Sequence, residues 1–312
     1  MMIDKQLPPF QRAFLHPKYW GLWFGLGIFK LILCLPYPML VKVGKGLGKL
    51  FTRLGFGKRR MRIAKRNLEL CFPDYTTSQI DEILAKNAES VGMAIIETGM
   101  AWFWSDERIL KLCKVEGAEH LKNQPEGKGI ILVGVHFLTL EFGARMIGLQ
   151  RQGIGVYRPN DNPLLDWIQF RGRVRSNKAM LDRKDLRGMI KALRAGETIW
   201  YAPDHDYGRK NSVFVPFFAV KESCTTAGTR MLLRSASNSI VVPFTPMRNE
   251  DFSGYTVKIS PPVDFSQCEN DVDTATLMNK VVEGEIMQAQ SQYMWLHRRF
   301  KTRPNESDPS LY

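Results

Sequence analysis

From residue 113 onward, short continuous apolar runs alternate with stretches whose apolar residues recur every three or four positions. The runs IILVGV (130–135), TIWYAP (198–203) and IVVPFTP (240–246) are typical of buried strands. Further strands are expected at GIGVYRP (153–159) and YTVKISPPV (255–263), and helices at 138–149, 163–174, 183–194, 225–235 and 271–289. This alternation predicts an α/β domain with a central, mainly parallel sheet flanked by helices. Ligands of such sheets bind beyond the carboxyl ends of the strands.

The N-terminal region has a different pattern. Residues 61–72 and 78–104 have helical spacing, and before them residues 19–40 are apolar apart from Lys30. A helix over 19–40 would reach about 33 Å, close to one hydrocarbon thickness. We therefore expect an N-terminal segment (1–18), a membrane anchor helix (19–40) that spans or is deeply inserted, and a globular domain (41–312). A helix lying in the membrane interface and a hydrophobic core helix remain alternatives.

Charge and cysteine content indicate the kind of partner and the redox state of the thiols. The net charge is +13, which suggests an anionic partner such as nucleic acid, anionic lipid or an acidic protein. Residues 42–66 carry ten Lys and Arg side chains and no acid. Beside a membrane segment, this composition favours anionic head groups on the cytoplasmic side over a nucleic-acid arm, with a solvated basic helix as the alternative. The five cysteines show no CxxC or metal-ligand spacing, which indicates reduced thiols.

Candidate chemistry lies after the predicted strands. His136 follows IILVGV and His205 follows TIWYAPD, where a histidine can meet substrate and act as a base near neutral pH. Glu141 comes five residues after His136, in HFLTLE. If His136 lies in the turn before a helix, Glu141 in its opening turns could orient the imidazole, as in a catalytic triad without its serine. The absence of a GxSxG sequence argues against an acyl-enzyme. The alternative is a helix-capping histidine and a surface glutamate.

HFLTLE resembles the His-x4-acid signature of the glycerolipid acyltransferase superfamily. More specifically, nearly the whole chain from about residue 7 resembles the late lipid A acyltransferases of Gram-negative bacteria. The stretches that carry this resemblance are VGVHFLTLEFGAR (133–145), GVYRPNDNPLLDW (155–167), RSNKAMLDRKDLRGMIKAL (175–193), WYAPDHDYG (200–208), VFVPFFAV (213–220) and QYMWLHRRFKTRP (292–304).

The resemblance implies a glycerolipid-acyltransferase-like fold and a reaction. A fatty acyl chain, lauroyl or myristoyl in the most similar branch, would pass from acyl carrier protein to a hydroxyl of a hydroxyacyl chain on (Kdo)2-lipid IVA. It implies no metal or cofactor, and a location on the cytoplasmic side of the inner membrane. Anionic membrane lipids and the acidic carrier protein both suit the basic excess. Chain length stays open among laurate, myristate and palmitoleate.

Several polar residues are candidates for substrate binding. Arg158 could bind a phosphate or sugar acid or align the acceptor, with a structural salt bridge as the alternative. The other candidates are Asn160, Asn162, Arg175, Lys178, Asp204 and His205, and Arg183 and Lys184 extend the basic surface. Asp204, His205 and Asp206 could be mistaken for metal ligands. A structural turn is the alternative for the PDHD sequence, and His297 is expected to be a packing or surface residue.

Two other classes of function compete with acyl transfer. One is a membrane-tethered module that binds anionic lipid or nucleic acid, with His136 structural. The other is a thioesterase or acyl hydrolase, against which the missing nucleophile elbow counts. Movement of a labelled acyl chain from carrier protein into lipid, into free fatty acid, or into neither would separate the three.

Overall fold

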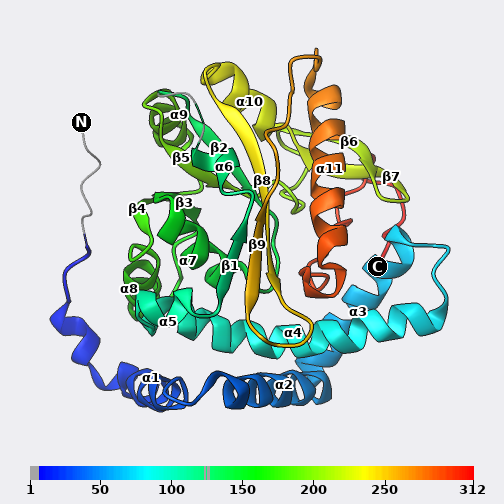
Figure 1. The fold of residues 1–312 in the computed structure, drawn as a ribbon. Coiled ribbons are helices and arrows are strands. Elements are labelled where there is room, and N and C mark those ends of the chain that lie inside the picture. Colours follow the sequence, from blue (N-terminus) through cyan, green and yellow to red (C-terminus); the bar gives the residue numbers. More distant parts are fainter. Residues whose placement is uncertain (1–6, 123, 125–126) are drawn as a thin grey trace.

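The computed structural model describes residues 7–122, 124 and 127–312 (Figure 1). A seven-stranded sheet forms its centre, in the order β1-β9-β8-β2-β5-β3-β4. Neighbouring strands run parallel except β8 and β9, so the prediction of a mainly parallel sheet is confirmed. The strands are β1 (Cys113–Glu116), β2 (Ile130–Gly134), β3 (Gly153–Tyr157), β4 (Asn177–Asp182), β5 (Thr198–Tyr201), β8 (Ile240–Arg248) and β9 (Tyr255–Ile259).

Three features of the β structure were not predicted. β1 and β4 are only partly buried and contain polar or charged residues, so they lack the continuous apolar run that marks β2. The antiparallel hairpin of β6 (Ser212–Phe217) and β7 (Val220–Thr226) stands apart from the main sheet. Half-buried strands give weaker sequence signals than strands covered on both faces.

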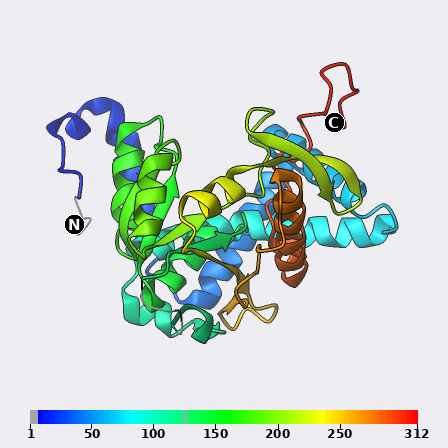
Figure 2. The same cartoon turned by 90° about the horizontal axis from the view of Figure 1, so that it is seen from above.

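Helices cover both faces and one end of the sheet (Figures 1 and 2). In Figure 1 the long helix α4 crosses below the sheet, with α1 and α2 beneath it. The helices are α1 (Trp20–Ile32), α2 (Tyr37–Arg53), α3 (Gly55–Cys71), α4 (Thr77–Phe103), α5 (Asp106–Leu110), α6 (Glu119–Lys122), α7 (Leu140–Gln150), α8 (Pro163–Arg173), α9 (Leu186–Arg194), α10 (Gly228–Ser235) and α11 (Asp271–Gln288), with 3-10 turns at Arg12–Leu15, Pro17–Tyr19 and Gln290–Gln292.

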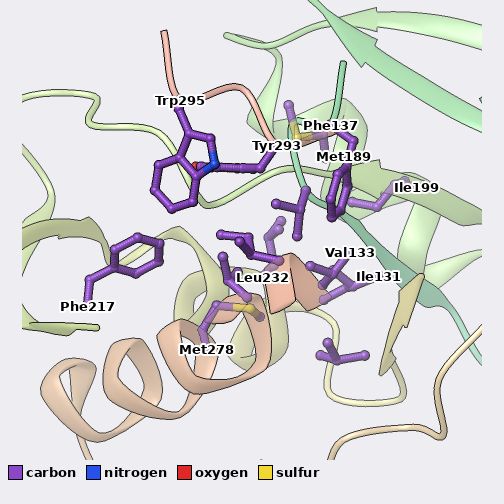
Figure 3. Close-up of a cluster of buried hydrophobic side chains, with 14 of the residues drawn as sticks. Ile131, Val133, Phe137, Met189, Ile199, Phe217, Leu232, Met278, Tyr293 and Trp295 are labelled. Carbon is purple, nitrogen blue, oxygen red and sulfur yellow. The ribbon is translucent and has the colours of Figure 1, made fainter. Parts of the chain in front are cut away.

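The largest buried apolar cluster joins the central strands to the helices on one face. Ile131 and Val133 of β2 lie near Leu232 of α10 and Met278 of α11 (Figure 3). The same cluster includes Trp295 and other aromatic side chains of the C-terminal segment. Burial of this apolar surface therefore ties the C-terminal segment to the carboxyl-end loop of β2.

The predicted anchor helix over 19–40 is wrong as a single helix. The chain forms α1, leaves helical structure at residues 33–36 and begins α2 at Tyr37. Pro36 is the N-cap of α2, and a proline disfavours helical backbone in the residue before it. No helix in the described ranges has both the length and the apolar character needed to cross a bilayer. The predicted domain boundary at residue 41 lies inside α2. Residues 1–6 of the predicted N-terminal segment lie outside the described part of the chain.

Close contact between α2 and α4 depends on glycine. A Cβ atom built at Gly92 of α4 would overlap the backbones of Gly44 and Gly48 of α2, so only hydrogen fits there. Gly46, on the exposed side of α2, has nothing within 4 Å of such an atom. The two helices thus approach through small residues, which places α2 directly against the helix that underlies the sheet.

Gly92→Ala should therefore destabilise the protein by about 1–3 kcal/mol, because the two backbones must separate to admit the methyl group. Gly46→Ala is the matched control and should be neutral or stabilising by up to about 1 kcal/mol, since alanine is the better helix former. Denaturant unfolding of both variants in the same detergent measures the difference. Equal stability of the two variants would contradict this account of the α2–α4 contact.

Candidate active site

The pairing of β2 with β5 brings the central residues of the site together. The strands run parallel, with Ile130 opposite Thr198 and Val133 opposite Tyr201. Their following loops therefore leave the sheet at the same edge. His136 lies in the loop after β2, and Asp204 and His205 lie in the loop after β5.

Asp204 is fully buried and accepts three hydrogen bonds. Its Oδ1 is 2.8 Å from Nδ1 of His136, and its Oδ2 accepts from the backbone N–H of His136 (3.1 Å) and from the hydroxyl of Tyr293 (3.1 Å). A buried carboxylate requires such donors. Burial alone would raise the pKa of Asp204, but the charge and hydrogen bonds of His136 outweigh it and hold that pKa well below its usual range.

An ionised Asp204 determines the tautomer of His136. Because the carboxylate can only accept, Nδ1 carries the proton and the lone pair of the neutral ring is on Nε2. Within the described residues Nε2 has no hydrogen-bond partner, and the His136 side chain is 20% exposed at the wall of a cavity. This is the arrangement of a base whose orientation is set by a carboxylate.

The expected contact between His136 and Glu141 is not formed, and this part of the sequence interpretation needs correction. Glu141 lies in the first turn of α7, as predicted, but its carboxylate accepts from Arg173 of α8 and from Nε1 of Trp102 on α4 (2.9 Å). The Arg173 guanidinium contacts both carboxylate oxygens, a geometry that fixes both groups. The first turn of α7 directs Glu141 toward these helices, and Asp204 takes the place beside His136.

Three imidazole rings form a continuous stack behind the dyad. His205 lies parallel to His136, with centroids 3.6 Å apart and planes 9° apart, and its other face lies on His297 at 3.9 Å and 15°. Ligand atoms of His136, Asp204 and His205 lie within 4.8 Å of one another, as metal ligands would. Lone pairs of parallel rings point along parallel planes and do not converge on one ion, so the arrangement favours stacking over coordination.

A cavity of about 760 Å³ opens in front of His136. Its apolar wall comes from β3, β4, α7, α9 and α10, and includes Leu140, Val156, Met180, Met189, Met231 and Leu232. His136, Glu141, Arg158 and His205 line it as well, together with Arg173, Arg183 and Lys184. An apolar space bordered by cations and one available imidazole suits a ligand with a hydrocarbon chain and an anionic head.

Other predicted binding residues have structural contacts. Arg158 reaches the cavity but is exposed and pairs with Asp161 (2.9 Å). Oδ1 of Asn162 accepts from the backbone of Leu164 and Leu165 and so caps α8, while Asn160 holds the preceding turn. These two asparagines are outside the set of residues that line the cavity in the described ranges.

Arg175 and Lys178 also lie away from the cavity wall. Nη1 of Arg175 donates to the carbonyl of Trp102 (2.9 Å), and Lys178 forms an exposed ion pair with Glu197 (2.7 Å). Both contacts join elements of the fold, so the geometry gives no support to their predicted part in substrate binding.

Three residues of the site, Arg173, Trp102 and Tyr293, escaped the sequence interpretation. Arg173 and Trp102 lie at the ends of helices and have no local signal. Tyr293 and His297 belong to the C-terminal segment, where the Met294 N–H donates to the carbonyl of His136 (3.0 Å). His297 was expected to be a packing or surface residue, and it packs against the ring of His205. The one signal in the sequence that these side chains meet was that His136, Asp204 and His205 follow two buried strands.

Comparison with known proteins identifies the family. The sequence model of the bacterial lipid A biosynthesis acyltransferase family matches residues 7–302. This chain belongs to that family. It is accordingly an acyltransferase of lipid A biosynthesis, as the resemblance of the sequence motifs indicated.

Individual relatives agree with the family assignment. The chain is 65% identical to a lipid A biosynthesis acyltransferase of Haemophilus influenzae over 100% of both chains. It is 57% identical to a lipid A biosynthesis lauroyltransferase of Escherichia coli, over 98% of this chain and 99% of that one. A lipid A biosynthesis palmitoleoyltransferase of Escherichia coli is 49% identical, over 97% and 98%.

The buried imidazoles predict how the stability of this acyltransferase changes with pH. Burial, followed by the charge of His136, lowers the pKa of His205 from 6.5 to about 3, and burial and Lys301 lower that of His297 to about 4. Below pH 6.5 the unfolded chain takes up protons that the folded protein excludes. Stability is therefore complete above pH 6.5 and should fall as the pH is lowered toward 4.

The melting temperature should decrease between pH 7 and pH 5, and His205→Phe should make that decrease smaller. Thermal unfolding of the two proteins in matched buffers measures both slopes. Parallel curves for wild type and His205→Phe would show that His205 does not contribute to the pH dependence.

Proposed function

We propose that this acyltransferase transfers a fatty acyl chain from acyl carrier protein to a hydroxyl of a hydroxyacyl chain on (Kdo)2-lipid IVA, with His136 as general base. The observation that carries the proposal is the His136–Asp204 pair at the cavity. Asp204 holds the Nδ1 proton, so that Nε2 can accept the proton of a hydroxyl. Histidine suits this task because its unperturbed pKa lies near neutrality.

The reaction needs no covalent intermediate on the protein. The acceptor hydroxyl gives its proton to Nε2 of His136 as its oxygen attacks the thioester carbonyl carbon. Collapse of the tetrahedral intermediate breaks the carbon–sulfur bond, and the leaving thiolate takes the proton from His136. Asp204 stays ionised and stabilises the imidazolium that forms between the two steps. The ester and the free thiol of the carrier are the products, and no metal or cofactor takes part.

Glu141 has a second role in this proposal. Its carboxylate holds the guanidinium of Arg173 at the cavity wall, where Arg173 can meet negative charge on the acceptor or on the tetrahedral intermediate. The apolar wall beyond it suits the acyl chain. Arg158, Arg183 and Lys184 add positive charge on the same side, which suits a phosphorylated acceptor and an acidic carrier protein.

The N-terminal helices support a location on an anionic membrane surface. Trp20, Phe24, Ile28 and Leu31 form one stripe along α1, and the exposed fractions of Phe24 and Leu31 are both 73%. Exposed cations follow on α2 and α3, among them Lys42, Lys49, Lys58, Arg59 and Arg62. An apolar stripe flanked by cations is typical of a helix that lies in the interface.

The opposite face of α1 connects this surface to the site. Leu22, Trp23 and Leu26 pack in a cluster with Trp102 and Phe103 at the end of α4. Trp102 is the residue that donates to Glu141 at the cavity. A lipid acceptor entering from the bilayer would therefore meet the Glu141–Arg173 side of the cavity first. We propose the cytoplasmic side of the bacterial inner membrane as the location.

Removal of the base tests the mechanism. His136→Ala should lower turnover by roughly 10²- to 10⁴-fold, because a positioned base contributes about that much. Asp204→Asn should also be slow, since a neutral amide neither fixes the tautomer by charge nor stabilises the imidazolium. Transfer of labelled acyl chains from carrier protein to (Kdo)2-lipid IVA is the measurement, with thermal unfolding as the check on folding.

Near-normal transfer by a folded His136→Ala protein would exclude the base assignment. Label that appears in free fatty acid rather than in lipid would indicate hydrolysis instead of transfer. Glu141→Gln tests the Glu141–Arg173 pair independently of the His136–Asp204 pair. It should lower the rate of acyl transfer because Arg173 loses its charged partner. Adding Arg173→Ala should lower the rate little further, because the two residues act as one unit.

Charge placed on the apolar stripe tests the membrane proposal. Phe24→Glu with Leu31→Glu should abolish cosedimentation with anionic vesicles, while Val272→Glu, at an exposed position on α11, should leave it unchanged. High salt alone should release little of the wild-type protein, since apolar insertion is not screened. Complete release of the wild type by salt, or full binding by the double variant, would contradict insertion of α1.

A further inference from the structure

Within the described part of the chain, two of the three stacked imidazoles are not held by hydrogen bonds through Nε2. His205 and His297 each have a buried Nε2 atom with no hydrogen-bond partner among the described residues. Neither nitrogen therefore holds its ring in place, and the two rings meet their neighbours in the stack through their faces. The buried Nε2 of His205 also has no access to an acceptor in the cavity.

The stack limits a tilt of the His136 ring that its hydrogen bond to Asp204 allows. The hydrogen bond from Nδ1 to Oδ1 fixes one point on the edge of the ring, but the ring can still tilt about that bond. Contact with the parallel face of His205 at 3.6 Å limits this tilt, and His297 supports His205 from behind at 3.9 Å. Edge and face together define the direction of the Nε2 lone pair.

We infer that His205 and His297 are positioning residues, which hold the plane of the His136 imidazole so that Nε2 faces the acceptor hydroxyl. This inference rests on the proposed role of His136 as base. It differs from the predicted role of His205 in acceptor binding, because it assigns the contact with His136 to the face of the His205 ring.

Attachment of the stack to the fold agrees with this role. His297 belongs to the C-terminal segment, which also gives Tyr293 to Asp204 and pairs Tyr293 with Phe137 beside His136. On the other side, Asp206 accepts from the backbone and hydroxyl of Thr302 (2.8 and 2.9 Å). Asp204 and His205, which both contact the His136 ring, are thus held in place by the C-terminal segment.

The neutral state of the supporting rings matters during the reaction. His136 becomes an imidazolium when it takes the acceptor proton, and a second positive ring at 3.6 Å would oppose that charge. Burial keeps the pKa of His205 and of His297 far below neutrality, so the stack presents an uncharged face to His136. The electron-rich face of a neutral ring can stabilise the imidazolium beside it.

Substitutions at His205 distinguish face contact from hydrogen bonding. His205→Ala removes the face and should lower kcat by about 10- to 100-fold with little change in KM for the lipid acceptor, as expected for a misplaced catalytic group. His205→Phe keeps a flat, uncharged ring and should restore most of the lost turnover. If His205 bound the acceptor through a nitrogen, Phe would be as poor as Ala and KM would rise.

A double-mutant comparison tests whether the effect passes through His136. On a His136→Ala background, His205→Ala should not lower the residual rate further, because there is no ring left to position. A further loss of about 10-fold on that background would overturn the inference. His297→Ala and His297→Phe provide a second pair at a more distant ring, where the same order with a smaller loss is expected, should His205→Ala fail to fold.

These outcomes separate the inference from the proposed function. Near-normal activity of His136→Ala would remove the base and with it the reason for the stack. A slow His136→Ala protein combined with equally slow His205→Ala and His205→Phe proteins would leave the base in place and overturn the stacking role alone.

Discussion

The buried carboxylate of Asp204 is the constraint on which the site depends. An ionised carboxylate out of contact with water needs donors on its oxygens, and Asp204 obtains them from the backbone and ring of His136 and from Tyr293. These contacts join the loops after two neighbouring strands to the C-terminal segment. The tautomer and orientation of His136 follow from them, and so does the availability of Nε2 at the cavity.

Two separate polar pairs lie at the cavity wall. His136 and Asp204 form a hydrogen-bonded pair at the carboxyl edge of β2 and β5, which we propose accepts the proton, whereas Glu141 and Arg173 form an ion pair between α7 and α8. Trp102 links the second pair to the end of α4, where the inner face of α1 also packs. The charged side of the cavity is thus connected through packed side chains to α1, the helix that carries the exposed apolar stripe.

Much of the fold was predictable because its central strands are apolar and β2 and β8 are almost completely buried. Continuous apolar runs at β2, β5 and β8 and helical spacing between them predicted the parallel sheet correctly. Partly exposed strands such as β4 gave no such run and were missed. The expected single helix over 19–40 was wrong, because the division into α1 and α2 depends on backbone geometry around Pro36, which a count of apolar residues does not reveal.

The sequence by itself determined the family, the α/β class and the position of His136 after a buried strand, because local apolar patterns and motif identity carry that information. Only the tertiary structure decided the partner of His136. Glu141 is close to His136 along the chain and Asp204 is 68 residues away, but parallel pairing of β2 with β5 brings the distant carboxylate to the ring and the first turn of α7 directs the near one to Arg173. The stack of His136, His205 and His297 likewise joins three separate segments. Contacts of this kind follow from packing in three dimensions and cannot be predicted from spacing along the chain.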